Sequence, residues 1–70
     1  MDILLNFPDT RTVLQAEQIL IRRKIPFETV PKSRYFPGKC GLSILCAKRY
    51  ENAVKNTLED AHISANFTYL

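Results

Sequence analysis

This chain lacks the features that mark several large classes of protein. None of its apolar runs approaches the roughly 20 residues that a transmembrane helix needs, and residues 1–6 contain no basic segment of the kind that begins a secretory signal peptide. With one histidine and two cysteines, the chain shows no spacing typical of a metal site. We therefore expect a cytoplasmic protein with reduced thiols, without a metal and without a bound cofactor.

The length of 70 residues also leaves no room for a separate cofactor-binding half. A domain of this size buries only about 60% of the surface that its unfolded chain exposes, so its core is thin. Hydrophobic residues at 46% and charged residues at 24% are ordinary for a globular domain. Residues 1–70 are thus predicted to form one small domain, for which association between copies is the most available extra source of stability.

Hydrophobic spacing predicts six elements in the order strand, helix, strand, strand, helix, strand. A short apolar run ends at Pro8, and a helix capped by Asp9 or Thr10 follows and ends before Pro26. The strands are predicted at 2–7, 27–30, 41–47 and 66–70, and the second helix at 49–61. This order is typical of the α+β, ferredoxin-like split βαβ sandwich, in which two helices cover one face of a four-stranded antiparallel sheet.

The loop between the second and third predicted strands contains the residue best suited to chemistry. Lys32, Arg34 and Lys39 lie within eight positions of Cys40. Cations near a thiol favour the thiolate, which is the form of cysteine that attacks electrophiles or holds a transferred sulfur or selenium atom. Gly41 follows at once and, having no side chain, lets a large partner approach the sulfur.

The predicted topology brings Cys40 to the N-terminus of the first helix. The third strand should lie antiparallel to the first, so that its start is beside the end of the first strand, where Asp9 and Thr10 begin the helix. The amides and dipole of that helix end favour an anion, whereas the Asp9 carboxylate opposes one if it points inward.

The second thiol, Cys46, lies six residues farther along the same predicted strand. At about 3.3 Å per residue the two cysteines are roughly 20 Å apart, whereas a disulfide needs alpha carbons within about 7 Å. Cys46 shares its face with Leu42 and Ile44. It is therefore predicted to be a buried core residue, with a second reactive thiol as the alternative.

Several short motifs, taken in order and at their spacings, resemble the selenium/sulfur carrier protein-like family. They are Leu-Asn-Phe-Pro-Asp-Thr at 5–10, Ala-Glu at 16–17, Ile-Pro-Phe at 25–27 and Cys-Gly-Leu-Ser-Ile at 40–44, and together they cover nearly the whole chain. The resemblance implies a carrier or accessory protein, rather than a stand-alone enzyme, that holds a persulfide or selenopersulfide on Cys40. It also implies donor and acceptor proteins as partners. Lys24 and His62 stand where the family often has glycine after each helix, which predicts left-handed backbone there.

An alternative function is a non-catalytic interaction or regulatory module that forms homo-oligomers through the sheet face away from the helices. Leu4, Leu45 and Val30 could make that face partly apolar. Tyr35 and Phe36 fit a docking patch and a cover over the open end of the core equally well.

A third possibility is weak nucleic-acid binding, since the net charge is +3. Proteins of that kind stack bases on aromatic side chains of an open sheet face. Here Phe7, Phe27 and Phe67 can share the helix-covered face, which leaves no obvious stacking pair outside. Nucleic acid is therefore the weakest of the three alternatives.

Overall fold

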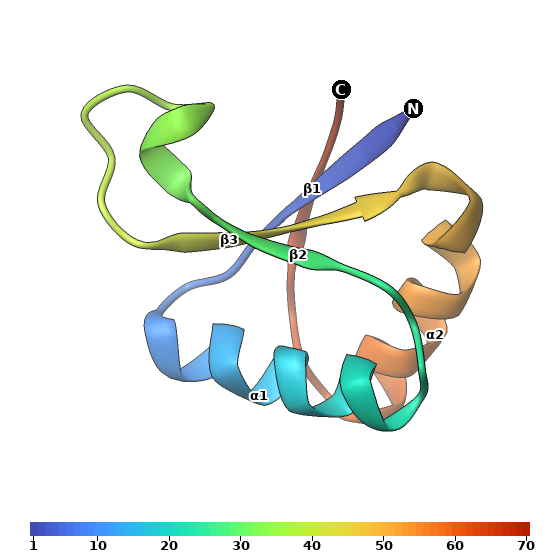
Figure 1. Ribbon diagram of the computed structural model, residues 1–70. Helices are drawn as coiled ribbons and strands as arrows, with labels where there is room; N and C mark the ends of the chain where they lie inside the picture. The colour runs from blue at the N-terminus through green and yellow to red at the C-terminus, as the bar shows by residue number, and fades with distance from the viewer.

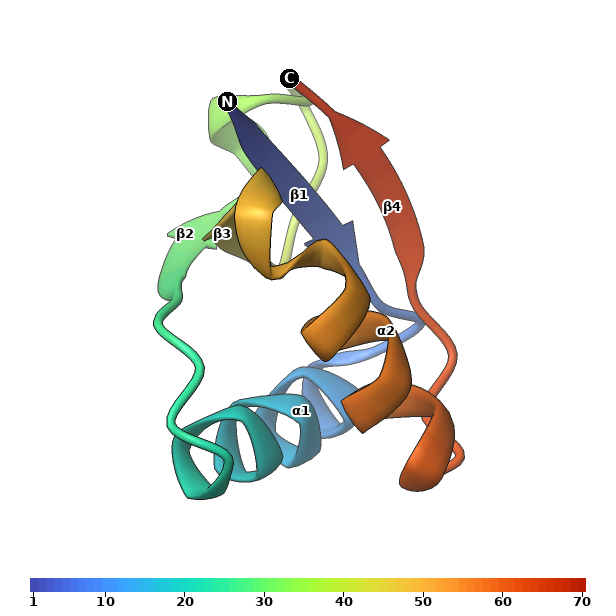
Figure 2. The same cartoon turned by 90° about the vertical axis from the view of Figure 1, so that its right-hand side faces the viewer.

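The predicted α+β ferredoxin-like sandwich is present in the computed structural model, which describes residues 1–70 (Figure 1). Four antiparallel strands form a sheet in the order β2-β3-β1-β4, and both helices cover one face of it (Figures 1 and 2). The elements are β1 (Asp2–Asn6), α1 (Thr10–Arg22), β2 (Glu28–Pro31), β3 (Leu42–Ala47), α2 (Glu51–Asp60) and β4 (Asn66–Tyr69). Short 3-10 turns at Lys32–Arg34 and Lys48–Tyr50 precede β3 and α2, so α2 begins later than predicted.

The alternation of side chains along the two central strands decides which residues enter the core. Ile3 pairs with Cys46 and Leu5 with Ile44, and all four point toward the helices. They pack with the apolar stripes of both helices, which include Val13, Ala16, Leu20, Val54 and Leu58.

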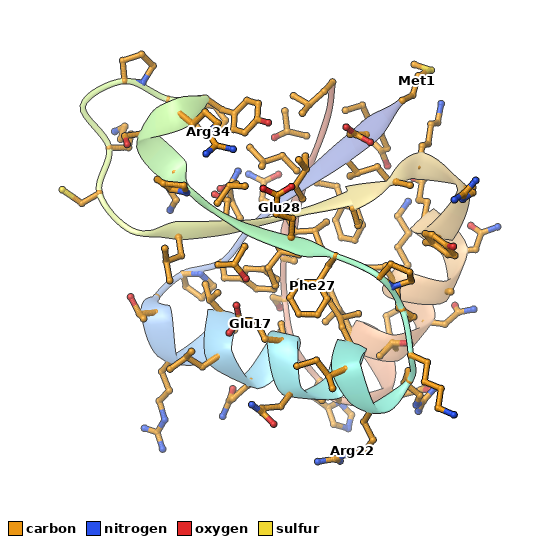
Figure 3. The ribbon with its side chains drawn as sticks, viewed as in Figure 1. Met1, Glu17, Arg22, Phe27, Glu28 and Arg34 are labelled. Carbon is orange, nitrogen blue, oxygen red and sulfur yellow. The ribbon has the colours of Figure 1, made fainter.

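The three phenylalanines predicted to share the helix-covered face do so. Phe7 belongs to the core, and Phe27 and Phe67 pack against it. Figure 3 shows Phe27 between β2 and α1. No aromatic pair from these strands is therefore left on the other face to stack bases.

The sheet face away from the helices is not open. Leu4, Val30 and Ser43 lie on this face by register, yet each is at most 1% exposed. The connection from β2 to β3, residues 32–41, folds across the same face (Figure 1). Of the three residues predicted to form an apolar patch there, Leu4 and Val30 are covered within one chain and Leu45 is only partly exposed. The alternative of homo-oligomers through this face is therefore not favoured, and it stays a prediction.

The covering loop is closed at its base and shaped by two glycines. The backbone N–H of Lys32 donates to the carbonyl of Gly41 at 2.9 Å, which ties the start of the loop to its end. Gly38 and Gly41 have φ angles of 85° and 107°, in the region that favours glycine. Tyr35 and Phe36 are half-buried on this loop. Their burial favours the role of a cover, over the outer sheet face rather than over the end of the core.

Both helices end in the same left-handed motif, and neither uses glycine for it. Lys24 and His62 have φ angles of 60° and 57°, which confirms the prediction for these positions. After α1 the N–H of Ile25 donates to the carbonyl of Leu20, and after α2 the N–H of Ile63 donates to the carbonyl of Leu58, each at 2.9 Å. These bonds define a Schellman motif, whose left-handed residue is usually glycine because a Cβ is strained there.

Glycine at either position should therefore stabilise the protein. We expect Lys24→Gly and His62→Gly each to raise the free energy of unfolding by about 0.5–1 kcal/mol, since the relief of left-handed strain outweighs the added entropy of the unfolded chain. For a domain of this size that corresponds to a rise in Tm of roughly 2–8 °C. Thermal unfolding followed by circular dichroism measures it. Lys39→Gly, which makes the same replacement at a residue without positive φ, should not raise Tm. An equal change in Lys24→Gly and Lys39→Gly would contradict the argument.

Candidate functional site

Cys40 is exposed just before β3 and lines a hollow of about 110 Å³ at the N-terminus of α1. The antiparallel pairing of β1 with β3 places the end of β1 beside the start of β3, and α1 begins directly after β1. The predicted neighbourhood of thiol and helix end is therefore present. The other residues that line the hollow are Phe7, Pro8, Asp9, Thr10, Val13, Lys32, Gly41 and Leu42.

The three predicted cations of the loop do not all gather at this hollow. Lys32 lines it, because the hydrogen bond from its N–H to the Gly41 carbonyl holds it across the base of the loop from Cys40. Arg34 and Lys39 are exposed and lie outside the lining. Figure 3 shows Arg34 on the turn above the outer sheet face. One of the three cations therefore lines the hollow together with Cys40, and the other two lie on the surrounding surface.

Asp9 is the cap of α1, and Thr10 is its first residue. The Asp9 carboxylate accepts hydrogen bonds from the backbone N–H of Thr12 at 2.8 Å and from the Thr12 hydroxyl at 2.7 Å. These bonds, the side-chain one first, lower the pKa of Asp9 below its usual value. Asp9 therefore stays ionised at neutral pH. Its negative charge at the hollow offsets part of the positive charge of Lys32 and of the N-terminal end of the α1 dipole.

Cys46 lies on the core side of β3 and is only 4% exposed. Burial, and after it the negative charge of Asp2, raise the pKa of Cys46 to about 11. A thiol that is both protonated and covered is a poor nucleophile. Both cysteines are free thiols. The prediction that Cys46 is a core residue is confirmed, and Cys40 is the accessible thiol of the chain.

A second and larger hollow borders the first, and sequence reasoning missed it. It has a volume of about 500 Å³ and is lined by Asn6, Phe7, Pro8, Ser64, Ala65 and Asn66. Phe7 and Pro8 also line the Cys40 hollow, so they form the wall between the two. Asn6 of β1 is paired with Asn66 of β4 in the sheet, and no local sequence motif indicates that pairing. The Ser43 hydroxyl donates to Oδ1 of Asn6, which orients its amide.

No group of three histidine, cysteine, aspartate or glutamate side chains is placed to hold a metal ion. Neither helix has the length and apolar character needed to cross a bilayer.

The chain matches a protein-family model over residues 2–70. The family is described as "Putative Se/S carrier protein-like", and the match takes in Cys40, both hollows and the covering loop. The chain belongs to this family, as its motifs indicated. No curated protein and no solved structure matches the chain.

Proposed function

We propose that this member of the selenium/sulfur carrier-like family holds sulfane sulfur, or selenium at the oxidation level of a selenopersulfide, on Cys40 and passes it to a partner enzyme. The observation that carries the proposal is the contrast between its two thiols. Cys40 is exposed in a hollow with Lys32 and the start of α1, whereas Cys46 is sealed in the core. A chain with one accessible thiol can accept a sulfur atom without losing it to an internal disulfide.

The chemistry is an exchange without net oxidation. The Cys40 thiolate attacks the terminal sulfur of a donor persulfide, a bond forms between Sγ and that sulfur, and the donor thiolate leaves. In delivery, a thiolate of the partner attacks the same outer sulfur, and Cys40 departs as a thiolate. A donor that presents a selenopersulfide would transfer selenium by the same two steps.

The residues around Cys40 have distinct roles in this proposal. Lys32 stabilises the anionic persulfide at close range, and the cap at Asp9 holds the amides of α1 in place behind it. Arg34 and Lys39 favour approach by an acidic partner surface. Gly41 adopts a positive φ with open space where a Cβ would be, so it both forms the turn and leaves the sulfur accessible.

Persulfide loading tests the proposal directly. The protein is incubated with inorganic polysulfide, freed of excess reagent and weighed intact by mass spectrometry. The wild type and Cys46→Ala should gain the mass of one sulfur atom, which dithiothreitol removes, and Cys40→Ser should gain none. Absence of the adduct from the wild type, or its presence on Cys40→Ser, would count against Cys40 as the carrier.

A further inference from the structure

The larger hollow, lined by Asn6, Ser64 and Asn66 and bordered by Phe7 and Pro8, is a shallow and open depression that the carrier chemistry does not use. Its lining contains two amides, a hydroxyl and apolar surface, and no charged side chain. A charged ligand would lose its hydration there without gaining an opposite charge. A neutral group that has both hydrogen-bond donors and acceptors would find partners in the two amides and the hydroxyl. Peptide bonds have that pattern.

The strand that begins at this hollow offers a second feature suited to a peptide. β4 is at the edge of the sheet, and Figure 2 shows no element beside its outer side. Edge strands are commonly protected by charge or proline, and the other edge strand, β2, contains Glu28 and Pro31. β4, Asn66–Tyr69, contains neither a charged residue nor a proline. Its unpaired backbone groups can bind an extended chain.

We propose that the Asn6–Ser64–Asn66 hollow, with the adjoining edge of β4, binds the uncharged polypeptide segment that flanks a cysteine of the partner protein. This inference rests on the proposed function, because it supplies the acceptor that Cys40 needs. A segment held in the hollow lies next to the Cys40 hollow across the wall of Phe7 and Pro8. The partner's thiolate then attacks the outer sulfur of the Cys40 persulfide, and Cys40 leaves as a thiolate.

A probe that contains no persulfide tests docking separately from carriage. The probe is the mixed disulfide of thionitrobenzoate with Gly-Cys-Gly, blocked as acetyl and amide at its ends so that the peptide is uncharged. The Cys40 thiolate attacks the peptide sulfur, the disulfide breaks and thionitrobenzoate leaves as a coloured thiolate. The reference probe is the same disulfide made with 2-mercaptoethanol, which has no peptide groups. The measured quantity is the ratio of the two second-order rate constants.

We expect the wild type to react about tenfold faster with the peptide probe, the effect of one or two added hydrogen bonds. Asn66→Leu, which removes an amide from the hollow, should bring the ratio near one. Asn56→Leu makes the same replacement at an exposed position of α2 that lines neither hollow, and it should keep the wild-type ratio. Thermal unfolding verifies that both variants are folded.

The possible results separate the two proposals. Equal rates for the two probes with the wild type, or an unchanged ratio in Asn66→Leu, would overturn docking even if polysulfide still loads Cys40. A third probe is the same peptide with free and therefore charged ends. If it reacted faster than the blocked peptide, the ligand would be a low-mass peptide thiol, and the proposal of a polypeptide segment would be overturned. Failure of polysulfide loading with a retained tenfold preference would instead overturn the carrier function and leave the docking site in place.

Discussion

Cys40 is expected to react with iodoacetamide at least two orders of magnitude faster than Cys46 at about pH 7.5. Alkylation consumes the thiolate, and the Cys40 thiol is exposed to the reagent. With its pKa raised to about 11, Cys46 is ionised in only about one molecule in three thousand. Its 4% exposure lowers the rate further, because the reagent reaches the sulfur only when the core opens.

The two thiols are distinguished by mass spectrometry of peptides after timed labelling. Cys40→Ser should take up almost no label in buffer and one label in denaturant, where Cys46 becomes exposed. Cys46→Ala should label in buffer at the wild-type rate. Rapid labelling of folded Cys40→Ser would show that Cys46 is reachable and would revive its role as a second reactive thiol.

Leu4→Ala is expected to destabilise the protein as strongly as Leu5→Ala, by about 2–5 kcal/mol. Both leucines are fully buried, although they lie on opposite faces of β1. In a ferredoxin-like sandwich with an open outer face, Leu4 would be exposed and its truncation would cost little. The large expected effect comes from residues 32–41, which cover that face.

Urea unfolding followed by circular dichroism measures both variants, with Leu14→Ala as the control. Leu14 is 51% exposed on α1, and its replacement should change stability by less than about 1 kcal/mol. If Leu4→Ala fails to fold, the milder Leu4→Val should still lower the midpoint more than Leu14→Ala does. Similar midpoints for the Leu4 and Leu14 variants would mean that the loop does not seal the outer face in solution.

The covering loop, residues 32–41, forms a third layer on this thin two-layer domain and increases the apolar surface that the chain buries. Leu4 and Val30 are buried on the outer face, which is the side of the sheet on which the covering loop lies. The same loop begins with Lys32 and ends at Cys40 and Gly41. Packing of the loop against the sheet therefore also positions the thiol, so a substitution that loosens the loop should affect both stability and reactivity.

Much of the fold was predictable because it depends on local spacing and one topological rule. Strand alternation predicted the core positions of Ile44 and Cys46. The start of the helical pattern limited the cap of α1 to Asp9 or Thr10, and the structure uses Asp9. The nearness of Cys40 to α1 then follows from antiparallel pairing of β1 with β3. The covered outer face did not follow, because residues 32–41 have no period that shows which surface they pack against.

The sequence by itself determined the order of elements, the core face of each strand, the left-handed residues Lys24 and His62, and the family. The order of elements and the core faces depend on the periods of neighbouring residues, which the chain carries wherever it folds, whereas Lys24, His62 and the family came from the resemblance of its motifs to the family. Only the tertiary structure decided that Leu4 and Val30 are buried on the outer face, that Lys32 alone of the three loop cations lines the Cys40 hollow, and that Asn6 pairs with Asn66 across the strands. Those outcomes depend on contacts between segments far apart in the chain, whose strength is set by packing and not by local pattern.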